Sequence, residues 1–269
     1  MFFIKAFAFL KRDLQEQLSF KFQFLMQIFS IAAQTWVFFY LGKFIQISLG
    51  SGSNGEFDYF GFLLLGVAFS GYQFSGLNSF ALALHKEIGQ GTLESVLMTP
   101  THPLTLIFAN ALWSFVAATI KVCGYLLIGT LCFGLQIKSM NFWALGFGFI
   151  LTALSFSGLG LISAAFVLIY KRGDPVAYAL NGLTRLFAGV YFPVTILPLW
   201  LQNISRFLPM THALAFMRGL LLEGKTLPEL RIYLVTLAGF AVLLLPLGLY
   251  VFQQAVQTAK RDGSLCYTD

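Results

Sequence analysis

Long uninterrupted apolar segments are the feature that most restricts what this chain can fold into. Residues 142–169, for example, contain no charged side chain, and ~20 apolar residues suffice to cross a bilayer. Over the whole chain 58% of residues are hydrophobic and 10% are charged, against roughly a quarter charged in soluble domains. Lipid admits only helices or closed barrels. Because the runs lack the short alternating pattern of barrel strands, we expect an all-α integral membrane protein.

The apolar segments predict six transmembrane helices in a single domain over residues 1–269. The expected spans are 22–49, 58–84, 104–135, 142–169, 176–191 and 232–252.

Four other segments are too polar or too interrupted to be spans. Residues 1–21 mix Phe with Lys and Arg, which predicts an amphipathic helix lying in the membrane interface. The polar loop 85–103 joins two spans, and 253–269 forms a polar tail. Residues 192–231 are apolar but broken by prolines, so short re-entrant helices are expected there, before the last span.

The distribution of Lys and Arg predicts the orientation, because cytoplasmic loops carry more of them. With six spans, one side holds nine: Lys5, Lys11, Arg12, Lys21, Lys86, Lys171, Arg172, Lys260 and Arg261. The other side holds five: Lys138, Arg206, Arg218, Lys225 and Arg231. We therefore expect a multi-pass protein of the cell inner (plasma) membrane with both termini cytoplasmic and 192–231 extracytoplasmic. The net charge of +6 then reflects this bias and not nucleic-acid binding.

Residues 219–226, GLLLEGKT, match the phosphate-loop pattern G-x-x-x-x-G-K-T. That loop works only between a strand and a helix, where backbone amides converge on phosphates. Here an amphipathic helical stretch precedes the match and Pro228 follows it, so we interpret the match as chance. The chain is expected to have no catalytic residues, no ATPase site and no bound cofactor of its own.

The polar loop carries the first part of a resemblance to a known family. Its sequence resembles the cytoplasmic loop of type-2 ABC exporter permeases, the membrane subunits that pair with separate ATPases. The residues that carry the likeness are Glu87, Gly91, Thr92, Leu93, Glu94, Leu97, Thr99 and Pro100.

The second part of the resemblance lies in the proline-rich region. Pro193 and Pro198 precede Pro209-Met210-Thr211-His212, and Arg218 follows six residues after the histidine. This is similar to the family's second signature. Together the two motifs, their order and the expected spans extend the resemblance over nearly the whole chain.

The resemblance implies a function and a set of partners. Two permease copies would pair with two cytoplasmic ABC ATPase subunits, which would bind ATP and magnesium. The 85–103 loop would supply the coupling helix that docks on the ATPase. The complex would be an ATP-hydrolysing translocase that exports its cargo.

The sequence constrains the identity of the cargo less than it constrains the type of transport complex. Polysaccharide-exporting members tend to begin the first span with an Arg-Tyr, Gly and Trp pattern, whereas residues 19–24 here read SFKFQF. This departure favours an amphipathic small molecule or lipid over a lipid-linked polysaccharide, which stays an alternative.

Two cations fall inside predicted spans. Lys121 lies near the middle of the third span and Arg185 about ten residues into the fifth. Charges at such depth are candidates for a translocation path, the alternative being structural cations at a permease–permease interface. The three histidines, His85, His102 and His212, are too scattered to predict a metal site.

Two further classes of protein remain as alternatives. An ATPase-independent secondary transporter would usually show repeated halves, and no internal repeat is evident. A membrane-bound enzyme or a scaffold is the other class, but an intramembrane enzyme needs clustered His, Asp or Ser groups, which the spans lack.

Overall fold

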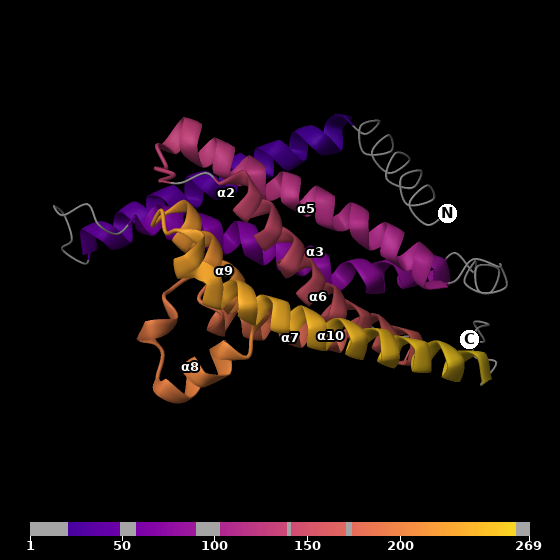
Figure 1. The fold of residues 1–269 in the computed structure, drawn as a ribbon. Coiled ribbons are helices and arrows are strands. Elements are labelled where there is room, and N and C mark those ends of the chain that lie inside the picture. Colours follow the sequence, from indigo (N-terminus) through magenta and orange to yellow (C-terminus); the bar gives the residue numbers. More distant parts are fainter. Residues whose placement is uncertain (1–20, 49–57, 90–102, 139–140, 171–173, 262–269) are drawn as a thin grey trace.

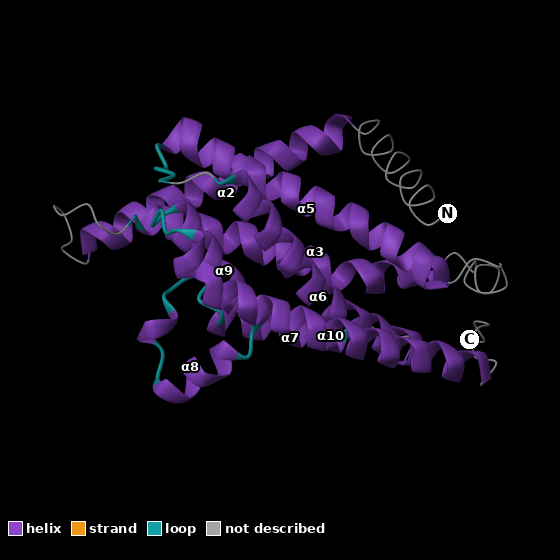
Figure 2. Ribbon diagram, viewed as in Figure 1, coloured by secondary structure: helices purple, strands orange, loops and turns teal. Residues whose placement is uncertain are grey.

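The structure is a computed structural model that describes residues 21–48, 58–89, 103–138, 141–170 and 174–261 (Figures 1 and 2). Within these ranges all the regular structure is helical, which confirms an all-α protein. The helices are α2 (Lys21–Ser48), α3 (Tyr59–Gly89), α5 (Pro103–Phe133), α6 (Phe142–Tyr170), α7 (Pro175–Phe187), the 3-10 turn η1 (Val194–Ile196), α8 (Leu199–Arg206), α9 (Pro209–Leu221) and α10 (Leu227–Arg261).

Five of the described helices are long and apolar enough to cross a membrane, so this is a multi-pass membrane protein. Their apolar stretches are Phe24–Ile47, Tyr59–Leu84, Ala111–Phe133, Phe142–Tyr170 and Leu227–Ala259. The interfacial helix expected over 1–21 and the end of the tail, 262–269, lie outside the described residues, apart from Lys21.

The helix expected over 176–191 is shorter than the sequence predicted. It ends at Phe187 after 13 residues, a length of about 20 Å against a hydrocarbon core of about 30 Å. The physical reason is Gly189, whose φ of +79° belongs to the left-handed region that terminates helices. Six spans therefore do not follow from helix length alone.

Helices α3, α6 and α10 run in the same direction through the bundle. Tyr72 of α3 donates a hydrogen bond to the carbonyl of Phe149 of α6 (3.2 Å), and further along α3 Phe80 packs against Gly160. Likewise Ser155 of α6 donates to the Leu237 carbonyl of α10 (3.1 Å), and Gly158 packs against Leu244. In both pairs the contacts advance together, which defines parallel helices.

Helices α2 and α5 run the opposite way. The rings of Phe115 and Phe108 in α5 pack on Tyr72 and Phe80 in α3 with their order reversed. α2 runs parallel to α5, because Tyr125 donates to Gln34 and, further along both helices, the Phe39 ring packs near the Phe133 ring. The first turn of α2 and the last turn of α10 consequently lie at the same end of the bundle (Figure 1).

The chain returns from that end to the other between α6 and α9. Asp174, just before α7, accepts a hydrogen bond from Ser163 of α6, while the Val190 carbonyl packs on Gly66 near the start of α3. In the parallel register of α3 and α6, Ser163 lies level with Ala83. Residues 66 to 83 rise about 26 Å along a helix, so the short segment 174–190 covers nearly the depth of a hydrocarbon core.

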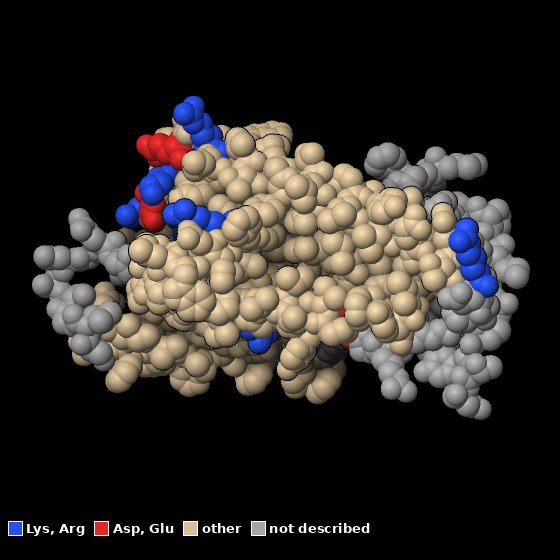
Figure 3. Space-filling model, turned by 90° about the horizontal axis from the view of Figure 1, so that it is seen from below, with Lys and Arg blue, Asp and Glu red and all other residues tan. Residues whose placement is uncertain are grey.

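The core lies around α3 and α6, whose apolar windows are 72% and 67% buried, compared with 11% for α2 and 17% for α10. α6 and α10 approach closely enough for their backbones to touch. A Cβ at Gly158 would overlap the Leu244 backbone, and one at Gly248 would overlap the Gly158 carbonyl. In the face shown in Figure 3, Lys, Arg, Asp and Glu gather together at one end, Lys or Arg alone lies at the other, and the broad middle shows little charge, as lipid contact requires.

Candidate functional site

The proline-rich region folds into η1, α8 and α9 at the end of the bundle where α3 begins (Figure 1). Each proline of the predicted signature starts a helix. Pro193 and Pro198 are the N-cap residues of η1 and α8, and Pro209 is the first residue of α9. Proline suits these positions because the first helical N–H groups have no partner within the helix. Whether these short helices enter one leaflet stays a prediction.

Arg218 of α9 is the centre of this region, and its side chain is only 9% exposed. Its Nη1 donates to the carbonyl of Gly189 (2.8 Å). Its Nη2 donates to the carbonyls of Phe62 (2.9 Å) and Val190 (3.2 Å), and the guanidinium lies 3.4 Å from the centroid of the Phe62 ring. One side chain thus joins α9, α3 and the segment that follows α7.

Two other side chains bind carbonyls of the same segment. Tyr59 Oη donates to the Tyr191 carbonyl (2.8 Å), and Ser205 of α8 donates to the Phe187 carbonyl (2.6 Å). We call the carbonyls of residues 187, 189, 190 and 191 the carbonyl cluster. They lie at the end of α7 and just after it, where a helix leaves its last acceptors unpaired. A cation at this position is also stabilised by the negative end of the α7 helix dipole.

Burial lowers the pKa of Arg218 to about 9, because it removes water from the guanidinium, while Tyr59 and Glu223 act in the opposite direction. The guanidinium therefore remains charged at neutral pH. Its charge is met by backbone dipoles and the Phe62 ring, which is how a cation can be accommodated among apolar helices.

The backbone of the carbonyl cluster fits against α3 only because α3 has a glycine there. A Cβ at Gly66 would overlap the Val190 carbonyl and would lie 2.9 Å from Arg218 Nη2. Gly66 therefore permits the close approach on which the arginine contacts depend.

His212 has a local packing role in the structure. Its Nε2 lies 2.9 Å from the Arg206 carbonyl at the end of α8, and its ring packs near Tyr233 and Phe240 of α10. It thereby ties the start of α9 to both neighbouring helices. Among the described residues no three His, Cys, Asp or Glu side chains gather closely enough to hold a metal ion.

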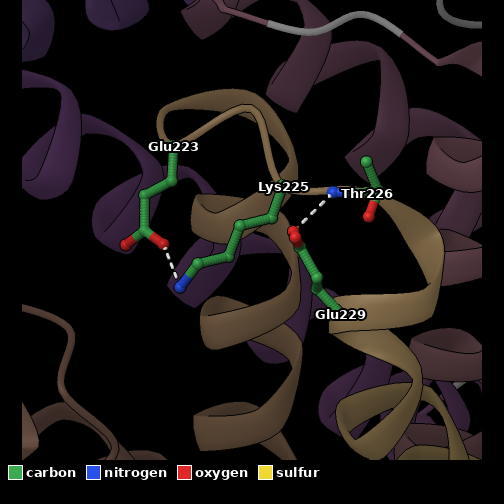
Figure 4. Close-up of polar contacts among 4 residues, drawn as sticks. All are labelled: Glu223, Lys225, Thr226 and Glu229. Carbon is green, nitrogen blue, oxygen red and sulfur yellow. Dashed lines mark hydrogen bonds and ion pairs between the residues drawn. The ribbon is translucent and has the colours of Figure 1, made fainter.

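The phosphate-loop match does not form a phosphate cradle (Figure 4). Residues 219–221 end α9 and Leu227 begins α10, so the match lies in a tight turn between two helices. The amide of Lys225 donates to the Gly219 carbonyl (2.9 Å), and the amide of Thr226 donates to Glu229 Oε2 (2.9 Å). Lys225 Nζ lies 2.6 Å from Glu223, which raises the pKa of Lys225. These donors are engaged within the turn itself.

The predicted path residues lie on different helices. Lys121 is on α5 and Arg185 is in the last turn of α7, and both are exposed on the surface of the single chain. Whether either faces a path stays a prediction. Of the predicted coupling residues, Glu87 is in the last turns of α3, and Gly91, Thr92, Leu93, Glu94, Leu97, Thr99 and Pro100 lie outside the described residues.

A sequence model of the family described as ABC-2 type transporter matches residues 5–222, which is most of the chain. The chain belongs to the ABC-2 type transporter family. The match spans the polar loop, the short helices and Arg218, and it confirms the family to which the sequence motifs pointed.

Curated relatives cover a smaller part of this ABC-2 family chain. YbhR of Escherichia coli (strain K12), described as a probable multidrug ABC transporter permease, is 26% identical over 133 residues. The aligned part is 49% of this chain and 36% of that relative. The YbhR of Escherichia coli O157:H7 gives the same values. The chain thus aligns with little more than a third of the length of these relatives.

The residues of the site were only partly visible in the sequence. Arg218 was marked by its motif, but its hydrogen-bond acceptors on Phe62, Gly189 and Val190 are backbone carbonyls, which leave no signature in side-chain type. Tyr59 and Ser205 are common residues at a membrane interface and in a short helix. The one available signal was Gly66 within an apolar helix, where a glycine often marks close approach of another backbone.

Proposed function

We propose that this chain is the membrane-spanning subunit of an ATP-driven ABC exporter. Two copies would dimerise and couple to two separate ABC ATPase subunits, which bind ATP and magnesium and hydrolyse the nucleotide. The observation that carries the proposal is the ABC-2 family match over residues 5–222 of a chain with five long apolar helices.

The cargo in this proposal is an amphipathic small molecule or lipid moved out of the cytoplasm. Two observations support it: the SFKFQF start of the first span, and the description of the YbhR relatives as probable multidrug permeases. Export of a lipid-linked polysaccharide would use the same machinery and is distinguished by the cargo test below.

The proposal includes a sixth crossing made by residues 174–190. α6 and α10 are parallel, so the chain has to return across the bundle between them. The return from the level of Ser163 to the level of Gly66 is about 26 Å, close to the hydrocarbon thickness. Six crossings place both ends of the chain on one side, and the excess of Lys and Arg makes that side the cytoplasm.

The roles of the polar loop and the intramembrane cations follow from the same proposal. The 85–103 loop would dock on the ATPase at the cytoplasmic end, where α3 ends and α5 begins. Lys121 and Arg185 would line the path of the cargo. Arg218 would hold the short extracytoplasmic helices in place at the opposite end.

The test is isolation of the tagged chain from its native membrane, followed by reconstitution in liposomes with whatever ATPase accompanies it. We expect an ABC ATPase in stoichiometric amount, and ATP hydrolysis stimulated by amphipathic compounds more than by lipid-linked glycans. Stimulation by glycans alone would assign the polysaccharide class. Transport that continues without any ATPase, driven by an ion gradient, would refute the proposal in favour of a secondary transporter.

A further inference from the structure

A polar patch lies between α2 and α5, where the outer surface of the chain is otherwise apolar. Tyr125 Oη donates to Gln34 Oε1 (2.7 Å), and Gln34 Nε2 donates to Ser30 Oγ (3.2 Å). Lys121 precedes Tyr125 by four residues and therefore shares its helix face. Ser30, Gln34 and Lys121 are exposed, and Tyr125 is half-buried. We call these four residues the α2–α5 patch.

The patch lies within the apolar stretches of both helices, and Lys121 is at the middle of that of α5. Lys121 is ten residues from Ala111 and twelve from Phe133, the ends of the apolar stretch of α5, which corresponds to about 15 and 18 Å along the helix. A lysine side chain reaches roughly 6 Å, so its ammonium cannot arrive at either interface by bending along the helix. A lipid-facing charge at this depth is strongly unfavourable, so charged residues in spans face a cavity, a partner or a counter-charge.

The five long apolar stretches provide no carboxylate near Lys121 that could neutralise it. The apolar stretches of α2, α3, α5 and α6 contain neither Asp nor Glu, and in that of α10 the one acidic residue is Glu229, in the first turn. A second copy of this chain brings the same spans and therefore the same lack of carboxylates. The described apolar stretches therefore offer Lys121 no counter-charge, and an anion bound from outside the chain is the source that we consider.

We propose that the α2–α5 patch faces the translocation path and binds the anionic head group of an amphipathic cargo. Lys121 provides the charge that recognises the anion, while Ser30, Gln34 and Tyr125 provide neutral hydrogen-bonding groups beside it. The inference rests on the proposed export function and gives it a substrate class. The anion is a sulfonate, carboxylate or phosphate, carried either by a single-chain amphiphile or by a phospholipid.

The first test asks whether water and an anion reach the patch, and it does not depend on transport. In a chain with Cys123, Cys132 and Cys266 replaced by Ser, Ser30→Cys reports on the patch and keeps Lys121 intact. Phe29→Cys is the matched control, because Phe29 is 70% exposed on another face of α2. Both are reacted, in the reconstituted complex, with a charged water-soluble thiol reagent and with a lipid-soluble maleimide.

We expect Ser30→Cys to react with the water-soluble reagent and Phe29→Cys to react only with the maleimide. An alkyl sulfonate should slow the reaction at Ser30→Cys, and additional replacement of Lys121 by Gln should abolish this protection. Protection by phosphatidylglycerol instead of the alkyl sulfonate would identify a phospholipid as the source of the anion. Reaction of Ser30→Cys with the maleimide alone, or no protection by either anion, would overturn the inference.

The second test measures selectivity in ATP-driven transport. A fluorescent alkyl sulfonate, a fluorescent phosphatidylglycerol and an uncharged fluorescent alkyl glucoside are compared in the reconstituted complex. Lys121→Gln should lower transport of the anionic cargo about tenfold, the value of one charge-assisted contact of roughly 1.4 kcal/mol, and change glucoside transport less than about twofold. Lys121→Arg should retain most anion transport, and Arg231→Gln, an exposed cation near the start of α10, should behave as wild type.

The two proposals fail in different ways. If the wild-type complex transports none of the three probes, the export function is in error, while the thiol test still reports on the patch. If anion and glucoside transport fall equally in Lys121→Gln, export stands and Lys121 has a structural role instead of recognising an anion.

Discussion

Arg218 and Arg206 show how differently two arginines of one region are used. Arg206 is exposed in the last turn of α8, whereas the buried guanidinium of Arg218 donates to three carbonyls from two parts of the chain. The planar fork of arginine is suited to several acceptors at once, which the ammonium of lysine is not.

We therefore expect Arg218→Met to lower the free energy of unfolding by about 2–5 kcal/mol, because it leaves buried carbonyls without donors. Arg218→Lys should fall between Met and wild type. The measurement is thermal unfolding of the purified protein in nanodiscs, with Arg206→Gln as the exposed control. A midpoint for Arg218→Met equal to that of Arg206→Gln would show that the carbonyl contacts add nothing.

Gly66 and Gly71 provide a matched pair on one helix. A Cβ at Gly66 would overlap the Val190 carbonyl, whereas a Cβ at Gly71 would meet no atom within 4 Å. Gly66→Ala should therefore destabilise the protein by about 1–3 kcal/mol through strain, and Gly71→Ala should be neutral or slightly stabilising through helix propensity. Unfolding midpoints of the two variants, measured side by side, decide this. Equal midpoints would mean that the carbonyl cluster can move away from α3 without cost.

At the scale of elements, the sequence predicted the long helices well and the short ones only by position. The span expected over 142–169 corresponds to Phe142–Tyr170, and that over 104–135 to Pro103–Phe133. The lengths of these helices follow from the lengths of their apolar runs, which can be read directly from the sequence. α7 ends at Phe187 because the chain turns at Gly189 to bring its carbonyls to Arg218, Tyr59 and Ser205, and this depends on residues up to 132 positions away.

α10 is also longer than the apolar segment 232–252 that predicted it. It begins at Leu227, where Glu229 accepts from the Thr226 amide, and continues to Arg261. The extra turns carry polar residues such as Gln253, Gln254 and Gln257. A prediction from hydropathy alone therefore placed the end of this helix too early. Hydropathy reports on the environment of a helix, whereas its ends depend on capping and packing.

The connection between α3 and α5 is the element on which coupling to an ATPase should depend. We expect Glu94→Ala and Gly91→Pro to leave ATP hydrolysis largely intact and to lower transport about tenfold or more, equivalent to roughly 1.4 kcal/mol of coupling. The reason is that a connection between two long helices transmits a displacement only if it is stiff, and these changes should weaken or distort it. ATP consumed per molecule transported is the quantity to measure in proteoliposomes. An unchanged ratio in both variants would remove the loop from the coupling route.

At the scale of the whole molecule, the parallel arrangement of α3, α6 and α10 makes a topological prediction. If 174–190 crosses the membrane and the amino terminus is cytoplasmic, α8 lies outside and the tail lies inside. With Cys123 and Cys132 replaced by Ser, an impermeant thiol reagent added outside intact cells should label Asn203→Cys, in exposed α8, and should not label the native Cys266. Permeabilised cells should show labelling of both. Labelling of Cys266 and not of Asn203→Cys from outside would contradict the sixth crossing or the orientation, and labelling of both from one side would contradict the crossing by α10.

The contacts of Arg218 also determine an order of events during synthesis of the chain. The hydrogen bond from Arg218 to Phe62 joins residues separated by 156 positions. At about 5–20 residues per second, a ribosome needs roughly 8–30 s to synthesise that interval. During this time α3 and later α7 are inserted, and the carbonyls of Gly189 and Val190 wait for Arg218 only over the last 28–29 residues of that interval. A nascent chain stopped before residue 218 should therefore be cleaved by membrane proteases faster than one that extends through α9.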